Sequence, residues 1–180
     1  MSLEKLIHRC TQQDIKAQEW LYREYSGKLF TLCLKYSGSY EEAKDNLQDS
    51  FLKIFENISQ YSGKGTFEGW ITRITINTAL KKAAKPGVFL TLIEEVPNEP
   101  EIEVDDEIVS GDFLIEIIQE LPDRYRHVFN LHSMEGYTHK EIAVMLNISE
   151  GTSKSNLARA RAKLKERIET YQNSRKTRLL

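Results

Sequence analysis

Apolar side chains recur every three or four residues over most of this chain, and no segment of useful length shows the alternation of two that a β-strand requires. A spacing of three and four indicates amphipathic helices. The periodic residues form two stretches, 20–80 and 113–168, and the segment between them, 86–111, holds three of the four prolines. The sequence therefore predicts an all-α fold class: two small helical domains joined by a flexible linker.

The expected boundaries follow from where the helical pattern starts and stops. The first domain is predicted at 1–85 and the second at 112–172, with a tail at 173–180. The linker at 86–111 is acidic, and a short extended piece is expected in it at 88–93.

Three helices are expected in the first domain. The first ends at Gly38, the second starts at Ser39 or Tyr40, and a loop at 60–66 precedes the third. Their expected apolar stripes are Trp20, Leu21, Tyr25, Leu29, Leu32 and Tyr36, then Leu47, Phe51, Ile54, Phe55 and Ile58, then Phe67, Ile71 and Ile74.

The second domain carries the pattern of a helix-turn-helix. Helices are expected to start at Phe113 and after Pro122, and Gly136 is expected to stop the second of these. Thr138 and Glu141 form a capping box for a short helix, Asn147 starts a tight turn, and Ser149 caps the last long helix. That helix should bury Leu157, Ala160, Leu164 and Ile168 and turn outward Lys154, Ala158 and Arg161. Its N-terminal end should also offer Gly151, Thr152, Ser153, Ser155, Asn156 and Arg159.

Charge is distributed unevenly along the chain. Residues 91–120 contain 11 acidic and no basic residues, whereas residues 121–180 contain 12 basic and 6 acidic residues. A basic region behind an acidic one is typical of a nucleic-acid surface and a linker that avoids it. A helical hairpin with a solvated basic face is the alternative.

Two further polar groups lie on the predicted helices of the first domain. Asp45, Gln48 and Asp49 share a face, which spacing alone favours as an ordinary solvated surface. Arg73, Asn77 and Lys81 form a second stripe near Tyr61, Phe67 and Trp70. Basic residues beside aromatic rings suit single-stranded nucleic acid, although the rings are equally compatible with core positions.

No catalytic or metal-binding signature is present. The two cysteines and four histidines have no metal-ligand spacing, and the chain lacks HExxH, a glycine-rich phosphate loop and GxSxG. We therefore expect neither catalysis nor a cofactor nor a metal site. No long apolar run and no secretory signal are found, so a cytoplasmic protein without membrane insertion is expected.

Two sets of motifs resemble a known family. Asp45–Phe51, followed by Phe67–Ile74 and Asn77, resembles region 2 of bacterial RNA polymerase sigma factors. Glu120–Phe129, together with the segments at 135–137, 141–143 and 148–155, resembles region 4. The order of the motifs, and the absence of a domain between them, resemble the extracytoplasmic-function (ECF) group.

The resemblance implies a sigma factor that binds core RNA polymerase and directs promoter-specific transcription initiation, with promoter DNA and an anti-sigma factor as further partners. The resemblance implies that Asp45, Gln48 and Asp49 dock on the polymerase. This replaces the interpretation from spacing alone, which favoured an ordinary solvated surface. The −10 element would meet Lys64, Arg73, Asn77 and Lys81, and the −35 element would meet Lys154, Ser155, Arg159 and Arg161.

The chain departs from the family pattern in two places. The basic run after Asn77 is thin, and Ser153 stands where a valine is common. Two other functions are weighed against the sigma factor. A stand-alone helix-turn-helix regulator would have no need of the polar patch at Asp45, and a helical enzyme would need the catalytic cluster that the sequence lacks.

Overall fold

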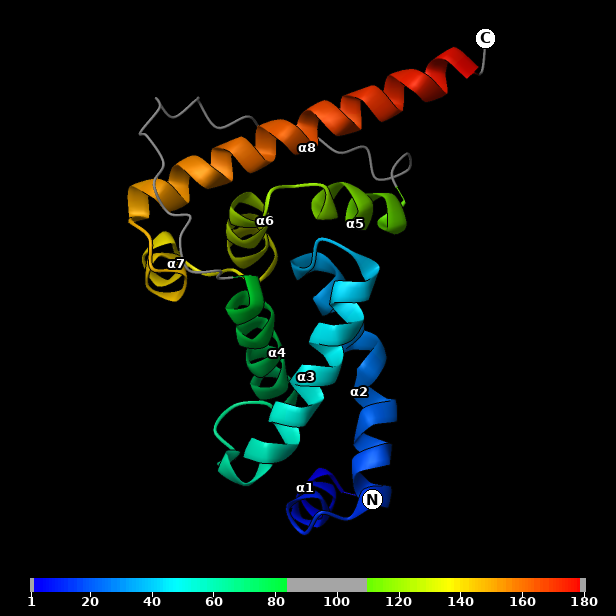
Figure 1. Cartoon of the computed structure of the whole chain (residues 1–180), viewed down its shortest axis with the longest axis vertical. Coiled ribbons are helices and arrows are strands. Elements are labelled where there is room, and N and C mark those ends of the chain that lie inside the picture. Colours follow the sequence, from blue (N-terminus) through cyan, green and yellow to red (C-terminus); the bar gives the residue numbers. More distant parts are fainter. Residues whose placement is uncertain (1, 84–109, 179–180) are drawn as a thin grey trace. The chain divides into compact units, whose positions relative to one another are not determined.

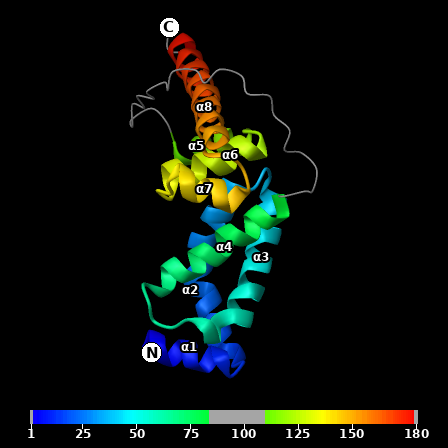
Figure 2. The same ribbon diagram turned by 90° about the vertical axis from the view of Figure 1, so that its left-hand side faces the viewer.

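The computed structural model describes residues 2–83 and 110–178, and the regular elements in those ranges are all helical (Figures 1 and 2). This confirms the predicted fold class. The chain divides into two compact units, 1–84 and 85–180, which are described separately. Almost all of the expected linker, including the extended piece at 88–93, lies outside the described residues.

Unit 1 is a bundle of three helices closed at one end by a fourth. α2 (Ile15–Tyr36), α3 (Tyr40–Asn57) and α4 (Phe67–Ala83) pack against one another. α1 (Leu3–Thr11) lies across the end of the bundle, against α2 and the 3₁₀ turn η1 (Ile58–Gln60) (Figure 2).

The break between α1 and α2 was not foreseen from the periodicity, and its cause is local. Gln13 adopts the left-handed conformation with φ 57°. Asp14 then caps α2 by accepting hydrogen bonds from the backbone N–H groups of Lys16 and Ala17, at 3.0 and 3.2 Å. Arg9 donates to the same carboxylate at 2.8 Å. Together these bonds hold the tight turn that aims α1 across the bundle.

The core of unit 1 agrees with the expected stripes at most positions but not at all. Leu21 and Trp20 are neighbours about 100° apart on α2, so they point in different directions from the helix axis. Leu21 is buried, whereas Trp20 is 44% exposed, and its expected core position was wrong. On α4, Ile74 is half-buried, and Thr75 and Ile76 take the buried positions instead.

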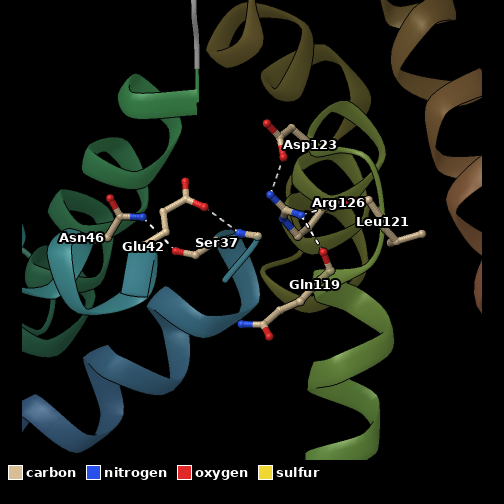
Figure 3. A network of polar contacts seen from close by, with 8 residues as sticks. Ser37, Glu42, Asn46, Gln119, Leu121, Asp123 and Arg126 are labelled. Carbon is tan, nitrogen blue, oxygen red and sulfur yellow. Dashed lines mark hydrogen bonds and ion pairs between the residues drawn. The ribbon is translucent and has the colours of Figure 1, made fainter. Parts of the chain in front are cut away.

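Polar contacts fix the α2–α3 corner. α3 begins at Tyr40, one of the two expected starts, and Ser39 caps it by accepting from the Glu42 backbone N–H at 3.2 Å. The Glu42 carboxylate accepts in turn from the backbone N–H of Gly38 at 2.7 Å. The fully buried Asn46 amide donates to the Ser37 hydroxyl at 2.8 Å (Figure 3). These contacts satisfy part of the polar surface that the close helix approach removes from water, while the buried Oδ1 atom of Asn46 accepts no hydrogen bond from the residues that the structure describes.

Unit 2 is organised around one long helix, α8 (Glu150–Arg178) (Figure 1). α5 (Gly111–Gln119), α6 (Asp123–Phe129) and α7 (His139–Leu146) all pack against it. α8 continues past residue 172, where the domain was expected to end. The core between α5, α6 and α8 consists of Ile117, Ile118, Leu121, Tyr125, Ala160, Leu164 and Ile168.

The end of α6 differs from an ordinary helix. It continues into a single π-helical segment, η2 (Asn130–Met134), in which the backbone N–H of Glu135 donates to the carbonyl of Asn130 at 3.0 Å. The chain then leaves the helix at Gly136, whose φ of 77° favours glycine. The predicted stop at Gly136 is confirmed, while the π geometry had no signal in the sequence.

Two contacts tie the outer part of α8 to α5. The carboxylate of Glu120, just after α5, receives two hydrogen bonds from the Arg167 guanidinium, at 2.6 and 2.8 Å. Beside it, the rings of Phe113 and Tyr171 stack with centroids 4.1 Å apart. The direction of α8 is therefore set both at its N-terminal half and near its C-terminal end.

Candidate nucleic-acid interface

The helix-turn-helix begins at α7 with the capping box that the sequence predicted. The backbone N–H of Glu141 donates to the Thr138 hydroxyl, while the Glu141 carboxylate accepts from the Thr138 backbone N–H at 2.8 Å. That backbone N–H, and after it the Thr138 hydroxyl, hold the pKa of Glu141 below its usual range. Asn147 closes the helix in the left-handed conformation, with φ 53°, and the chain turns directly into α8.

The N-terminal end of α8 carries the residues expected to meet the −35 element. Ser149 caps it by accepting from the Thr152 backbone N–H at 3.0 Å, which confirms the predicted start. Lys154 is exposed, whereas Ser155, Arg159 and Arg161 are half-buried. The Ser155 hydroxyl donates to the Thr152 carbonyl at 3.0 Å, so its proton is already used within the helix.

The expected outward face of α8 needs a correction. Ala158 was expected to point outward with Lys154 and Arg161, but it is only 1% exposed. Asn156, expected to be available at the same end, is also buried. α7 and α6 both pack against this part of α8, so the buried arc is wider than the four-residue stripe suggested. The exposed face at this end of α8 is correspondingly narrower than expected.

A polar contact joins the two helices of the motif inside this buried arc. Nδ1 of His139, the first residue of α7, lies 2.9 Å from the hydroxyl oxygen of Ser153 on α8. Ser153 is completely buried. The imidazole of His132 in η2 stacks on that of His139, with ring centroids 4.5 Å apart and planes 23° apart.

Sequence reasoning missed a buried arginine beneath the motif. Arg126 is only 2% exposed and donates to the backbone carbonyls of Gln119 and Leu121, at 2.9 and 2.8 Å (Figure 3). Its guanidinium also pairs with Asp123. Arg126 thus holds the α5–α6 corner. An arginine at this position looks like any exposed helix residue in a periodicity analysis, so the sequence carried no signal for it.

The polar stripe of unit 1 lies on the surface of α4. Arg73, Asn77 and Lys81 are all exposed, one helical turn apart, as expected. Lys64 is exposed in the loop that precedes α4. Thr66 starts the helix, and its hydroxyl accepts from the backbone N–H of Gly69 at 3.1 Å.

The aromatic residues beside this stripe form a packed group. Phe67 is buried, which agrees with the interpretation of this ring as a core residue. Its ring centroid lies 5.2 Å from that of Tyr61 and 5.8 Å from that of Trp70. The Tyr61 hydroxyl donates to the Gly65 carbonyl at 2.9 Å and so closes the loop. Tyr61 and Trp70 are half-buried, with part of each ring at the surface.

The face of α3 expected to bind polymerase is available. Asp45 and Gln48 are exposed and Asp49 is half-buried. Leu52, one turn further along the same face, is 56% exposed and was not picked out from the sequence. The signal was present in the spacing, because Leu52 falls outside the apolar stripe of α3. We call these four residues the α3 patch.

No group able to hold a metal ion occurs within residues 2–83 and 110–178. Cys10 and Cys33 are both buried free thiols, and burial is the main cause that raises the pKa of Cys10. Within the same ranges, no helix has the length and apolar character needed to cross a membrane.

Comparison with known proteins finds a matching family model for each of the two units. The family model "Sigma-70 region 2" matches residues 21–86, and "Sigma-70, region 4" matches residues 114–164. Together these matches cover more than half of the chain, and they occur in the order that the motifs predicted. The chain belongs to the sigma-70 family of sigma factors.

Curated relatives of this sigma factor agree with that assignment. It is 29% identical over 164 residues to the ECF RNA polymerase sigma factor SigE of Mycolicibacterium smegmatis, a match that covers 86% of this chain and 63% of that one. It is 27% identical over 182 residues to the ECF RNA polymerase sigma factor SigW of Bacillus subtilis, covering 93% and 97% of the two chains. A solved structure of CnrH in complex with the cytosolic domain of CnrY aligns with 17% identity and a TM-score of 0.49, covering 92% of this chain and 96% of that one.

The family therefore establishes the function of this chain as directing transcription initiation. The region 2 match contains the α3 patch and the α4 stripe, and the region 4 match contains Lys154, Ser155, Arg159 and Arg161.

Proposed function

We propose that this sigma factor holds core RNA polymerase through the α3 patch and reads promoter DNA with two separate helices, α4 and α8. Catalysis of RNA synthesis belongs to the polymerase, since sigma factors as a class are not enzymes. We expect the protein to work in the cytoplasm, without a cofactor, and to be held inactive by an anti-sigma partner.

The observation that carries the DNA-reading part of the proposal is the exposure of Lys154 at the capped N-terminal end of α8. The second helix of such a motif enters the major groove with its N-terminal residues leading. Lysine and arginine reach the acceptors on guanine edges or the phosphates. Arg159 and Arg161, one to two turns further along, then lie where a helix leaves the groove and passes the backbone.

The −10 element is assigned to α4 and its preceding loop. Arg73, Asn77 and Lys81 present two cations and an amide along one exposed line, and Lys64 adds a third cation from the loop. A positively charged track next to partly exposed rings is suited to an opened strand, whose phosphates it neutralises and whose bases can stack.

The polymerase contact is assigned to the α3 patch because it combines two acids, an amide and an exposed leucine. A partner surface with basic residues around an apolar spot would complement it. The acids favour encounter and orientation, while burial of Leu52 adds affinity.

The test is transcription by reconstituted holoenzyme. The full-length chain and purified core polymerase are incubated with sheared genomic DNA of the source bacterium, and the transcripts are sequenced. We expect defined start sites with this chain and none with core polymerase alone. The variant Asp45→Lys/Asp49→Lys should lose core binding in a pull-down, while Glu19→Lys/Glu24→Lys, the same charge change at exposed sites of α2, should keep it.

Two results would contradict this proposal. If the Asp45→Lys/Asp49→Lys variant binds core polymerase as well as the Glu19→Lys/Glu24→Lys variant does, the docking assignment is wrong. If defined DNA sites are bound by the chain alone and core polymerase adds nothing, the chain acts as a stand-alone helix-turn-helix regulator.

A further inference from the structure

We propose that His139 is a positioning residue for the DNA-reading end of α8, acting through its hydrogen bond to Ser153. This inference rests on the proposed function of α8. Neither residue is available to contact DNA as a principal reader, because Ser153 is buried and His139 is turned toward it. Their effect would be on where the neighbouring side chains point.

The contact lies where three elements of unit 2 meet. His139 is the first residue of α7, Ser153 is in the first turn of α8, and His132 in η2 stacks against the His139 ring. The imidazole is therefore held by a ring on one side and by a hydroxyl in the helix-turn-helix interface on the other. Its orientation is determined by packing rather than by solvent.

A buried hydroxyl makes this contact directional. Ser153 has no exposure to water, and a buried polar group needs a partner to offset its desolvation. The His139 Nδ1 atom at 2.9 Å provides that partner, with either atom able to supply the proton. An apolar residue at 153 would pack without a directional contact to α7, whereas a hydrogen bond restricts the first turn of α8 to a narrow range of orientations.

Rotation of α8 matters because the reading residues follow Ser153 immediately. Lys154 is exposed next to it, and Ser155 comes one residue later. Successive residues of a helix are about 100° apart, so a small rotation of the first turn moves both side chains relative to the groove. Discrimination between bases requires bidentate hydrogen-bond geometry. A small rotation of the helix therefore weakens base discrimination more than it weakens phosphate binding.

The hydrogen bond depends on both residues of the pair. An apolar residue at position 153 cannot hydrogen-bond to an imidazole. In this chain the polar residue on α8 occurs together with a histidine on α7 that reaches it. We infer that the two positions act as one unit.

The experiment compares side chains of equal shape at position 153. Ser153→Thr keeps the hydroxyl, and Ser153→Val replaces it with a methyl group in the same outline. Each full-length variant is assembled with core polymerase and incubated with a promoter library randomised at the −35 element, which is sequenced before and after binding. The same variants are compared with His139→Leu and with His139→Leu/Ser153→Val, and Ser174→Val at an exposed serine of α8 is the control.

We expect Ser153→Thr and the Ser174→Val control to enrich −35 sequences as the wild type does. Ser153→Val and His139→Leu should each lower the enrichment of the best −35 sequences over the average by about tenfold, the loss of roughly one good base contact. The double variant should lose no more than either single variant, because both remove the same interaction. Thermal unfolding of each variant identifies any loss that comes from misfolding.

Three results would overturn the proposal: equal enrichment by Ser153→Val and wild type, failure of Ser153→Thr to match wild type despite normal unfolding, or losses that multiply in the double variant. Failure of the proposed function is distinguishable from these, since wild-type holoenzyme would then enrich no −35 sequence at all.

Discussion

Replacing Arg126 by methionine should destabilise unit 2 while leaving unit 1 intact. The change keeps an unbranched apolar stem but removes the guanidinium that donates to the carbonyls of Gln119 and Leu121. A hydrogen bond to a charged group is worth about 1.5–3 kcal/mol, so the loss of two predicts at least about 3 kcal/mol. The ion pair with Asp123 adds little to this loss of unfolding free energy. Its carboxylate is 63% exposed, and exposed ion pairs contribute little to stability.

The two units can be followed separately in one urea titration. Both tryptophans, Trp20 and Trp70, lie in unit 1, so tryptophan fluorescence reports on that unit alone. Far-ultraviolet circular dichroism reports on the helices of both. With a urea dependence of about 1.5 kcal/mol/M, typical of a small domain, a loss of 3 kcal/mol lowers the midpoint of unit 2 by about 2 M.

Arg124→Met is the matched control, since it makes the same substitution at an exposed position of the same helix. We expect it to unfold close to wild type. The reasoning is refuted if the circular dichroism midpoints of Arg126→Met and Arg124→Met agree within about 0.3 M, or if Arg126→Met moves only the fluorescence transition.

Three further predictions concern the capping box, promoter opening and the acidic segment. Because the pKa of Glu141 is lowered in the folded chain, its contribution to stability is present above the unfolded value near 4.5 and is lost as pH falls toward the folded value. The stability difference between wild type and Glu141→Gln in urea titrations should therefore be full at pH 7 and shrink below about pH 4.5, and a difference that stays constant down to pH 3 would contradict this. Asn77→Ala should slow strand opening in permanganate footprinting more than it weakens initial promoter binding, and equal loss of both would make the α4 stripe a general binding surface. Neutralising Glu101, Glu103, Asp105, Asp106 and Glu107 should tighten promoter binding by the free chain at low salt, with the gain fading as salt rises, because exposed charges are screened over about 8 Å at physiological salt. An equal gain from neutralising five acids in unit 1 would show that only net charge matters.

Local signals in the sequence determined much of unit 2. The Thr138–Glu141 capping box, the Ser149 cap and the stop at Gly136 each depend on residues within a few positions of one another, so spacing alone revealed them. The stripe of Leu157, Ala160, Leu164 and Ile168 was also found, because apolar periodicity reports the face that packs most tightly.

Features that depend on contacts between distant elements were missed. Ala158 is buried because both α6 and α7 cover its part of α8, which no periodicity within α8 can express. Arg126 is buried because backbone carbonyls at the α5–α6 corner receive its guanidinium. Leu52 shows the reverse case: its spacing already put it outside the apolar stripe of α3, and among the residues that the structure describes it is 56% exposed on a face that is otherwise polar.

The continuity of α8 limits how this protein can change in length. One helix carries Lys154 and Arg159 at one end and the core residues Leu164 and Ile168 further along, with no loop between them. A single inserted or deleted residue in that interval would turn the reading end by about 100° relative to the packed face. Such a change would turn Lys154 and Arg159 away from their present direction relative to Leu164 and Ile168, so the length of this interval should be preserved even where its residues change.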